Sequence, residues 1–419
     1  MKSKSKNEQQ VLVALDLGTT KVCTTIALKS ESKGMEIIGV GSHTSLGLKK
    51  GSVVNIDQTV KSIQASIEEA KLMAGIDVSH ATVGIAGNHI YSFNSTGVVA
   101  IKGKEITESD VNRVIEAAKA VVIPSEREVL HVIPQEFVVD KTTGIKDPVG
   151  MCGVRLEVHV HVVTGQTSLI QNLIKCVEQA GLKVDNLVLQ PLASSRSVLS
   201  EADKELGVLL VDIGGGTTDI AVWHNGSLIH SQIIPVGGNN FTNDLAVALK
   251  IPHNEAEKIK INHGCVLKEK LNQSAHITVQ GLIGTRPREV SLSFVADVLG
   301  ARADEIFQII NQTLKEKNID NLITGGVVLT GGGSLINGMS ELCEYTLERP
   351  TKVGYPIPFG GMTNIMQNPK FSTVVGLVLD AEANNQGEVV QVNNKDTKND
   401  DDIIGRLGSR LSNVFKELF

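Results

Sequence analysis

The distribution of hydrophobic and polar residues along the 419-residue chain predicts alternating strands and helices. In two segments an apolar run is followed by Asp-x-Gly, a turn of small residues and a second β-rich run. They are residues 11–28, VLVALDLGTTKVCTTIAL, and residues 207–223, GVLLVDIGGGTTDIAVW. Gly and Thr between two β-rich runs indicate a tight hairpin whose backbone can approach a ligand closely. A repeat at domain-size separation predicts two similar α/β halves with a ligand in the cleft between them.

Amphipathic patterns between these runs predict helices. Val60, Ile63 and Ile67 recur at helical spacing, and a similar pattern precedes Gly181. Another helix is predicted to begin at the capping pattern Thr107-x-x-Asp110. Because β-rich stretches flank this last helix, residues 81–165 are predicted to form a small inserted α+β subdomain.

The end of the chain follows a different pattern. Residues 383–402 are rich in Asn, Gln, Asp and Lys and predict a disordered linker. When residues 403–419, IIGRLGSRLSNVFKELF, are advanced by about 100° per residue, their apolar side chains cover an arc of roughly 160°. The apolar residues are Ile403, Ile404, Leu407, Leu411, Val414, Phe415, Leu418 and Phe419, and the basic residues opposite them are Arg406, Arg410 and Lys416. The pattern predicts an amphipathic membrane-binding helix, with docking on the protein's own body as the alternative.

Composition argues against nucleic-acid binding, a zinc site and a membrane-spanning helix. The net charge of −6 and the aromatic content of 3% disfavour nucleic-acid binding, which usually needs a basic face and often stacking rings. Five scattered cysteines without a C-x-x-C pair indicate a reducing compartment and no zinc site. No apolar run reaches the length of about 18 residues that a membrane-spanning helix needs. A cytoplasmic protein is expected, with any membrane contact made from the surface.

Three Gly-rich turns carry the candidate chemistry. In hairpins of this kind, main-chain N–H groups and Thr hydroxyls point at phosphate oxygens. Asp16 and Asp212 stand at strand ends, where each can hold a hydrated Mg²⁺ and position water. The third turn lies in residues 326–339, where a strand is followed by three glycines and a helix is predicted near Ser334. The candidate nucleotide contacts are Gly18, Thr19, Thr20, Lys21, Gly214, Gly215, Gly216, Thr217, Thr218, Gly331, Gly332, Gly333 and Ser334.

These motifs resemble those of the actin, sugar-kinase and heat-shock-chaperone ATPases over nearly the whole chain. Residues 16–21 and 212–219 match the two phosphate motifs of that superfamily, and residues 330–334 match its adenosine motif. Residues 189–199 and 374–381 resemble its two interdomain helices. Within the superfamily, residues 133–140 and 144–165 are similar to the inserted subdomain of the bacterial FtsA family of cell-division proteins.

The resemblance implies a two-lobed, actin-like fold, ATP and Mg²⁺ as cofactors, and weak ATPase activity. It implies adenine contacts from residues 237–264, in which Glu255 and Lys258 share a helical face; a surface ion pair is the alternative. It also implies contact with the FtsZ tail near Arg286 and Arg288, where a solvated basic turn is the alternative. The expected partners are FtsZ, further copies of this chain, membrane lipids and other divisome proteins, with no nucleic acid. The expected location is the cytoplasmic face of the inner membrane at the division site.

The predicted domain boundaries follow from these assignments. They are 1–80 with 166–200 for the first lobe, 81–165 for the insert, 201–240 with 326–382 for the second lobe, 241–325 for its subdomain, 383–402 for the linker and 403–419 for the terminal helix.

Other functions stay open from the sequence. A sugar kinase needs a general-base carboxylate beside the γ-phosphate, and no sugar-kinase signature stands between the two hairpins. A chaperone needs a large substrate domain after the nucleotide domain, where only the linker and tail follow. An actin-like adaptor of the pilus-assembly type is harder to exclude on the core alone, and the tail argues against it. His159 and His161 share one face of a strand, but no third metal ligand lies nearby in sequence.

Overall fold

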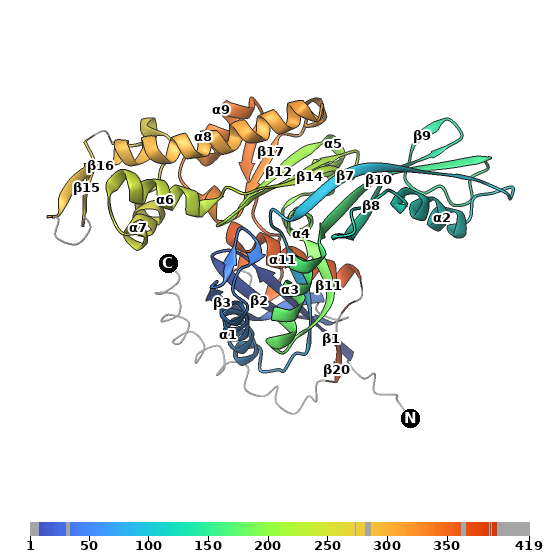
Figure 1. Ribbon diagram of the computed structural model, residues 1–419, viewed down its shortest axis with the longest axis horizontal. Coiled ribbons are helices and arrows are strands. Elements are labelled where there is room, and N and C mark those ends of the chain that lie inside the picture. The colour runs from blue at the N-terminus through green and yellow to red at the C-terminus, as the bar shows by residue number, and fades with distance from the viewer. Residues whose placement is uncertain are drawn as a thin grey trace.

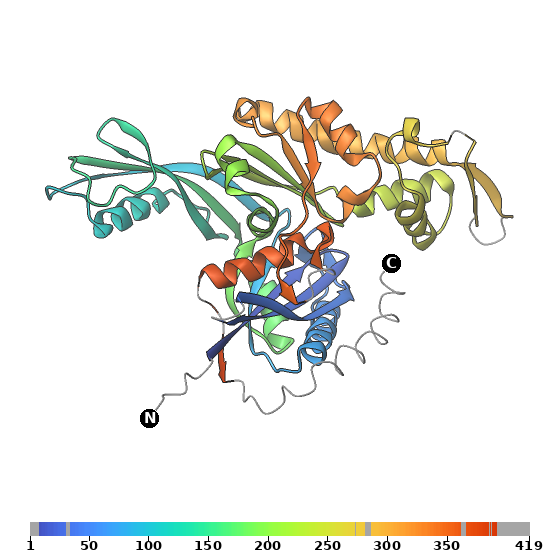
Figure 2. The same cartoon turned by 180° about the vertical axis from the view of Figure 1, so that it is seen from behind.

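The computed structural model describes residues 8–30, 34–272, 274–280, 286–361, 366–384, 386 and 388–391. Two lobes form the centre of the molecule. A subdomain projects from each lobe, and Figure 1 and, from behind, Figure 2 show that the two subdomains extend in opposite directions. The two similar α/β halves predicted from the two hairpins are confirmed.

The first lobe is built on a seven-stranded sheet in the order β11-β6-β1-β2-β3-β19, with β20 beside β1. Its helices are α1 (Ile56–Ala74), α3 (Thr167–Gln179), α4 (Gln190–Val198) and α11 (Ser372–Ala383). The predicted second-lobe range 326–382 is wrong for α11, because this helix packs on β1 of the first-lobe sheet. Its main strands are β1 (Glu8–Leu17), β2 (Lys21–Ser30), β3 (Gly34–Thr44), β6 (His80–Ile85), β11 (Lys183–Leu189), β19 (Gly360–Gly361) and β20 (Glu388–Gln391). A short hairpin joins β3 to α1, formed by β4 (Leu48–Lys49) and β5 (Ser52–Val53).

Both faces of this sheet are buried, which explains the unbroken apolar run in β1. Val13 and Leu15 pack with residues of α1 and α3, whereas Leu12 and Ala14 pack with residues of α11. A strand covered on both faces has no polar side, so its sequence reads as continuously hydrophobic.

The second lobe repeats the first. Its sheet has the order β14-β13-β12-β17-β18, in which three antiparallel strands are followed by a parallel one, as in β3-β2-β1-β6. The strands are β12 (Val208–Ile213), β13 (Thr218–His224), β14 (Ser227–Ile234), β17 (Val327–Thr330) and β18 (Thr351–Val353). The helices of this half are α5 (Glu201–Leu206), α6 (Gly238–Leu249), α7 (His253–His263), α8 (Leu292–Glu316) and α9 (Met339–Leu347), and a hairpin of β15 (His276–Val279) and β16 (Arg288–Ser291) precedes α8. Single 3-10 turns occur at η1 (Lys268–Lys270), η2 (Asp320–Leu322), η3 (Gly332–Leu335) and η4 (Pro369–Phe371).

The inserted subdomain is a four-stranded sheet in the order β7-β10-β8-β9, packed against one helix. Its elements are β7 (Ile90–Ala100), α2 (Glu108–Lys119), β8 (Arg127–Val139), β9 (Thr142–Ile145) and β10 (Arg155–Gln166). Both bonds of the capping box between Thr107 and Asp110 are present at the start of α2, as predicted. The boundary differs from the predicted residue 81, because β6 pairs with β1 and β11 in the first-lobe sheet and the insert begins after it.

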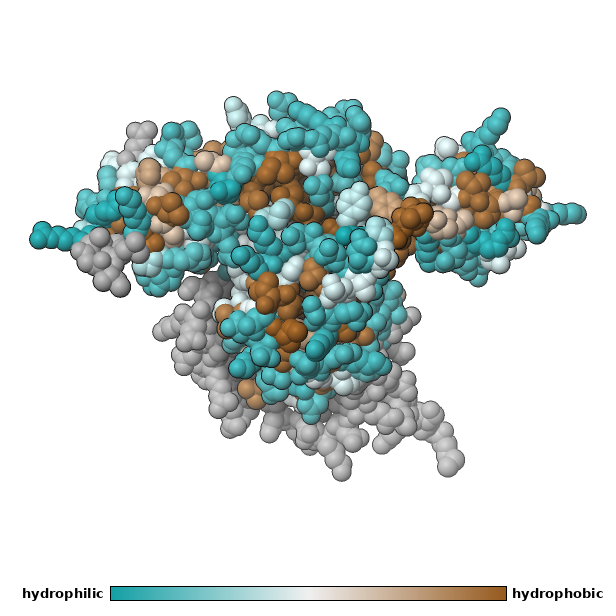
Figure 3. Space-filling model, viewed as in Figure 1, coloured by the Kyte–Doolittle hydropathy of each residue, from teal (hydrophilic) through white to brown (hydrophobic). Residues whose placement is uncertain are grey.

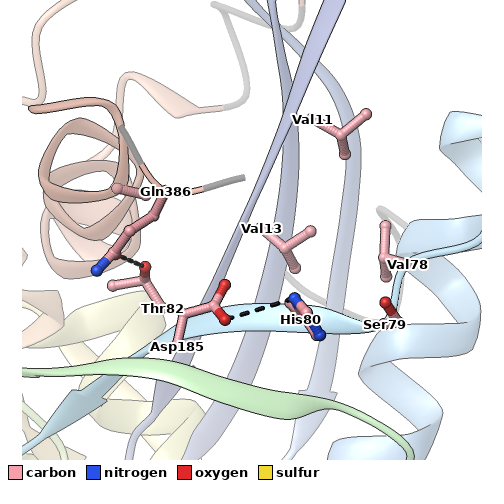
Figure 4. Close-up of a pocket in the computed structure, with 9 residues that line it drawn as sticks. Val11, Val13, Val78, Ser79, His80, Thr82, Asp185 and Gln386 are labelled. Carbon is pink, nitrogen blue, oxygen red and sulfur yellow. Dashed lines mark hydrogen bonds and ion pairs between the residues drawn. The ribbon is translucent and has the colours of Figure 1, made fainter. Parts of the chain in front are cut away.

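The structure also differs from the predicted linker. Within residues 383–402, β20 pairs antiparallel with the start of β1, from Glu8↔Gln391 to Val11↔Glu388. β6 pairs with β1 only from Ala14 onward, so the first residues of β1 have an open edge that β20 fills. Just before β20, the side chain of Gln386 accepts a hydrogen bond from Thr82 Oγ1 at 2.9 Å beside the His80–Asp185 ion pair (Figure 4). The predicted amphipathic helix, residues 403–419, lies outside the described residues.

Hydrophobic side chains gather in separate patches on the face shown in Figure 3, over both lobes and near the start of the insert. Among the described helices, none combines the length and the apolar character needed to cross a bilayer.

Candidate functional site

The two Asp-x-Gly turns face each other across the junction of the lobes. Each is closed by one main-chain bond, Gly18 N to Lys21 O at 3.0 Å and Gly214 N to Thr217 O at 2.9 Å. A Cβ atom added at Gly215 would lie 2.6 Å from Thr20 Oγ1, below any normal contact distance. The lobes therefore meet at their Gly-rich turns, and only glycine permits this approach.

The third turn joins the same site. Gly331 has φ of 79°, and a Cβ atom there would lie 2.3 Å from Asp212 Oδ1. The helix predicted near Ser334 is instead the single turn η3, and α9 begins only after Gly338, whose φ of 86° breaks the helical path. Ser334 is buried, and its hydroxyl donates to the Gly331 carbonyl at 2.7 Å.

Helix α4 touches the aspartates of both turns. Gln190, its first residue, donates from Nε2 to Asp16 Oδ1 at 2.9 Å. One turn later, Ser194 Oγ donates to Asp212 Oδ2 at 2.6 Å, and Thr373 of α11 donates to the same oxygen at 3.3 Å. Gln190 and Ser194 lie one turn apart on the same face of α4. Gln190 therefore contacts the carboxylate of the first lobe, and Ser194 contacts that of the second lobe. Gln190 and Ser194 were not predicted as site residues, although their segment was predicted to be an interdomain helix.

Three buried carboxyl groups surround this junction. Burial raises the pKa of Asp16 to about 6, and the Lys21 ammonium opposes that shift. Burial also raises the pKa of Asp212, against hydrogen bonds from Ser194 and Thr373. Asp219 lies opposite Asp212 in the β12–β13 register, and burial holds its pKa well above the usual range. Its Oδ1 is buried without a hydrogen-bond partner among the described residues. Desolvated carboxyl groups with spare acceptor capacity suit a bound cation.

Lys21 connects the first hairpin to the segment that precedes α11. Its ammonium donates to the Lys370 carbonyl at 2.7 Å and lies 4.0 Å from the centroid of the Phe371 ring. This cation adds to the lowering of the Lys370 pKa, which burial chiefly causes. The Lys21 ammonium thus lies close enough to Asp16 and Asp212 to favour their ionised forms.

Helix α7 carries two Glu-x-x-Lys pairs, which lie on different sides of the helix. Glu255 and Lys258 form an ion pair at 2.9 Å, and Lys258 is exposed. Glu257 and Lys260 pair at 2.8 Å on the inward side, where Lys260 Nζ also donates to the Gly238 carbonyl at 3.1 Å. Because Gly238 N donates to the Gly214 carbonyl, the second pair lies beside the turn at Gly214. The predicted pair thus lies on the outward side of α7, and the pair two residues later lies nearer the turn.

The remaining candidate residues lie apart from this junction. Arg286 is exposed, and the guanidinium of Arg288 in β16 donates to the Leu249 carbonyl. His159 lies between Glu136 and Glu157, whereas His161 bonds to Asn94 and Ser231. No group of three or more His, Cys, Asp or Glu side chains arranged to hold a metal ion occurs in the described part of the chain.

Comparison with known proteins gives consistent matches. The family described as "Cell division protein FtsA" matches residues 209–376, and the family described as "SHS2 domain inserted in FTSA" matches residues 87–164. The cell division protein FtsA of Pseudomonas aeruginosa is 46% identical over 370 residues, which cover 88% of this chain and 89% of that protein. The FtsA protein of Neisseria meningitidis serogroup B is 40% identical over 414 residues, covering 98% and 100%. Among solved structures, a PilM–PilN type IV pilus biogenesis complex matches with a TM-score of 0.65 at 16% identity, covering 88% of this chain and 98% of that chain.

Proposed function

Because the chain belongs to the FtsA family of bacterial cell-division proteins, we propose that it binds ATP between its two lobes and that the nucleotide sets the angle between them. The observation that supports this most directly is the contact of α4 with both Asp16 and Asp212. Because α4 is bonded to both Asp16 and Asp212, a change in the separation of the two turns would move α4 and change the angle between the lobes.

The residues of the junction fit Mg²⁺ together with a nucleotide. Asp16 and Asp212 are the carboxylates that would hold the ion through water, and the unpartnered Oδ1 of Asp219 is, among the described residues, a further acceptor in the same buried cluster. When bound, Mg²⁺ neutralises charge on the phosphate oxygens. The turns at Gly18 and Gly214 supply main-chain N–H groups for those oxygens, and the inward pair of Glu257 and Lys260 is the better candidate for the base and ribose.

Hydrolysis in this site is expected to be slow, with Gln190 as the residue that orients the attacking water. The Gln190 amide is attached to Asp16 through its N–H group, which leaves its carbonyl oxygen to accept from a water molecule. The carboxylates of Asp16 and Asp212 would then accept the proton of that water.

Gln190→Ala is expected to lower kcat for ATP hydrolysis by roughly 10- to 100-fold, because water is no longer held in line, while the Kd for ATP changes by less than about threefold. Steady-state phosphate release and equilibrium nucleotide titration measure the two effects. Gln58→Ala, at an exposed position of α1, serves as the matched control with unchanged kcat. A Gln190→Ala protein that hydrolyses ATP normally would remove the proposed role.

The pKa of Asp16 predicts opposite pH trends for nucleotide affinity and for stability. Its pKa is about 6 in the folded protein and 3.8 for the ordinary carboxyl, so folding favours the neutral form. The affinity for Mg-ATP should therefore fall as the pH drops through 6, since the ionised carboxylate is the form that suits the cation. The melting temperature of the nucleotide-free protein should instead fall as the pH rises through the same range. Asp16→Asn should flatten both trends, and trends that persist in this variant would assign them to other groups.

We propose further that the protein forms filaments on the cytoplasmic face of the inner membrane at the division site, where it tethers FtsZ through the tail of FtsZ. The terminal segment, residues 403–419, would act as the amphipathic anchor, and filaments would multiply its weak individual affinity. Arg286 and Arg288 remain the proposed partner surface for FtsZ. Other divisome proteins and membrane lipids complete the proposed partners.

Electron microscopy on lipid monolayers with ATP, with and without a carboxy-terminal FtsZ peptide, tests this proposal. Filaments that recruit the peptide support it. A pilus-assembly adaptor, the alternative from the sequence, would leave the monolayer bare of filaments and would not bind the peptide. The likeness to the pilus complex concerns the fold alone at 16% identity, whereas the two FtsA relatives match at 46% and 40%.

A further inference from the structure

A residue of the inserted subdomain contacts the segment that carries Gln190. Strand β8 of the insert lies beside β11 of the first lobe (Figure 1). The Nε2 atom of His131 in β8 accepts a hydrogen bond from the main-chain N–H of Leu189 at 3.0 Å. Leu189 is the last residue of β11 and the N-cap of α4, so the next residue in the chain is Gln190. One hydrogen bond and one peptide unit separate the insert from the residue that touches Asp16.

This bond needs a neutral imidazole with the proton on Nδ1. Burial, with a smaller contribution from the Arg196 guanidinium, lowers the pKa of His131 to about 4. The ring is therefore uncharged at neutral pH, and Nε2 keeps the lone pair that accepts from Leu189. The acceptor is present whenever the protein is folded under ordinary conditions.

The start of α4 lacks the usual capping bonds among the described residues. No side chain caps this helix, and Pro191 at its second position has no N–H to donate. A cavity of about 280 Å³ borders Leu189 and Pro191 and continues along Tyr91 of the insert and His230 of β14. On that side the first turn of α4 has no packing neighbour in the described part of the chain, whereas on the other side Ala193 packs with residues of α11. The bond from His131 is then one of the contacts that decide where Gln190 points.

We propose that His131 is a positioning residue through which the inserted subdomain controls the orientation of Gln190, and with it the rate of ATP hydrolysis. The inference rests on the proposed role of Gln190 in water positioning. His131 lies in the insert and acts through the Leu189 amide, so it contributes no group to the nucleotide site itself.

The insert also forms hydrogen bonds with the second lobe, so it contacts both lobes. Ser92 Oγ donates to the Ser231 carbonyl at 2.6 Å, and Gln135 Nε2 donates to the Leu228 carbonyl at 2.8 Å. Both acceptors belong to β14, the edge strand of the second-lobe sheet. A protein that binds and shifts the insert would move His131 relative to Leu189 and change the hydrolysis rate without touching the nucleotide.

The test compares His131→Leu, which removes the acceptor, with His131→Gln, whose amide oxygen restores one. His131→Leu should lower kcat roughly tenfold with the Kd for ATP changed by less than about threefold, and His131→Gln should recover most of the loss. His159→Leu is the matched control, since it removes a histidine of the same insert that pairs only with Glu136 and Glu157 in the described structure. Its kcat should match the unmodified protein.

A double variant separates positioning from a general loss of structure. In the Gln190→Ala background, His131→Leu should produce no further fall in kcat, because the residue that it orients is gone. Equal losses in His131→Leu and His131→Gln, or a full additional loss in the double variant, would overturn the inference. If Gln190→Ala lowers kcat and His131→Leu does not, only the inference fails. If Gln190→Ala has no effect, the proposed role of Gln190 fails and the inference falls with it.

Discussion

Removal of residues 403–419 is expected to abolish flotation with anionic liposomes while the Kd for ATP stays within about twofold. Burial of the apolar face contributes roughly 0.8 kcal/mol per CH₂, whereas each basic residue near an anionic surface contributes about 1 kcal/mol. With eight apolar side chains against three basic ones, hydrophobic insertion contributes more of the binding free energy than charge does. Flotation assays over a range of salt concentrations measure both contributions, and most binding should survive high salt.

Single substitutions refine this expectation. Leu411→Glu places a charge on the apolar arc and should act like the deletion, whereas Ser409→Glu, on the polar side, should leave most of the flotation. Equal losses in the two variants would show that charge alone governs binding. Flotation that survives the deletion would exclude the terminal segment as the anchor.

Features encoded locally were predictable from the sequence. The two hairpins are visible in the sequence because a close approach between turns requires glycine, and the helix at Thr107 carries its own capping signature. The likeness of the two lobes followed from the repeat, since similar segments fold alike.

Features set by tertiary contact were not predictable. Gln190 contacts Asp16 only because β11 leads into α4 between the two aspartates, and no local pattern marks this residue. The choice between Glu255 and Glu257 depends on how α7 is rotated against α6, and a shift of two residues turns a helix by about 200°. The pairing of β20 depends on an open edge of β1 that arises only where β6 stops.

Asp212→Asn is expected to weaken Mg-ATP binding by about 10- to 100-fold, a loss of the size seen when a group that supports a bound metal is removed. Isothermal titration with ATP in the presence of Mg²⁺ measures it. The same variant should keep its bonds to Ser194 and Thr373, because an amide oxygen accepts as the carboxylate does. Asp77→Ala is a suitable control, since Asp77 pairs with Lys71 at a highly exposed position and should change neither affinity nor stability.

The stability of the Asp212→Asn protein distinguishes a functional aspartate from a structural one. Burial raises the pKa of Asp212, so the ionised carboxylate is less favourable in the folded protein than in water. Removing that charge should leave the melting temperature of the nucleotide-free protein unchanged or higher, while the increase that Mg-ATP normally produces is lost. A lower melting temperature with an intact nucleotide response would contradict the assignment. The expected pattern would identify Asp212 as a residue that serves ligand binding rather than the stability of the free protein.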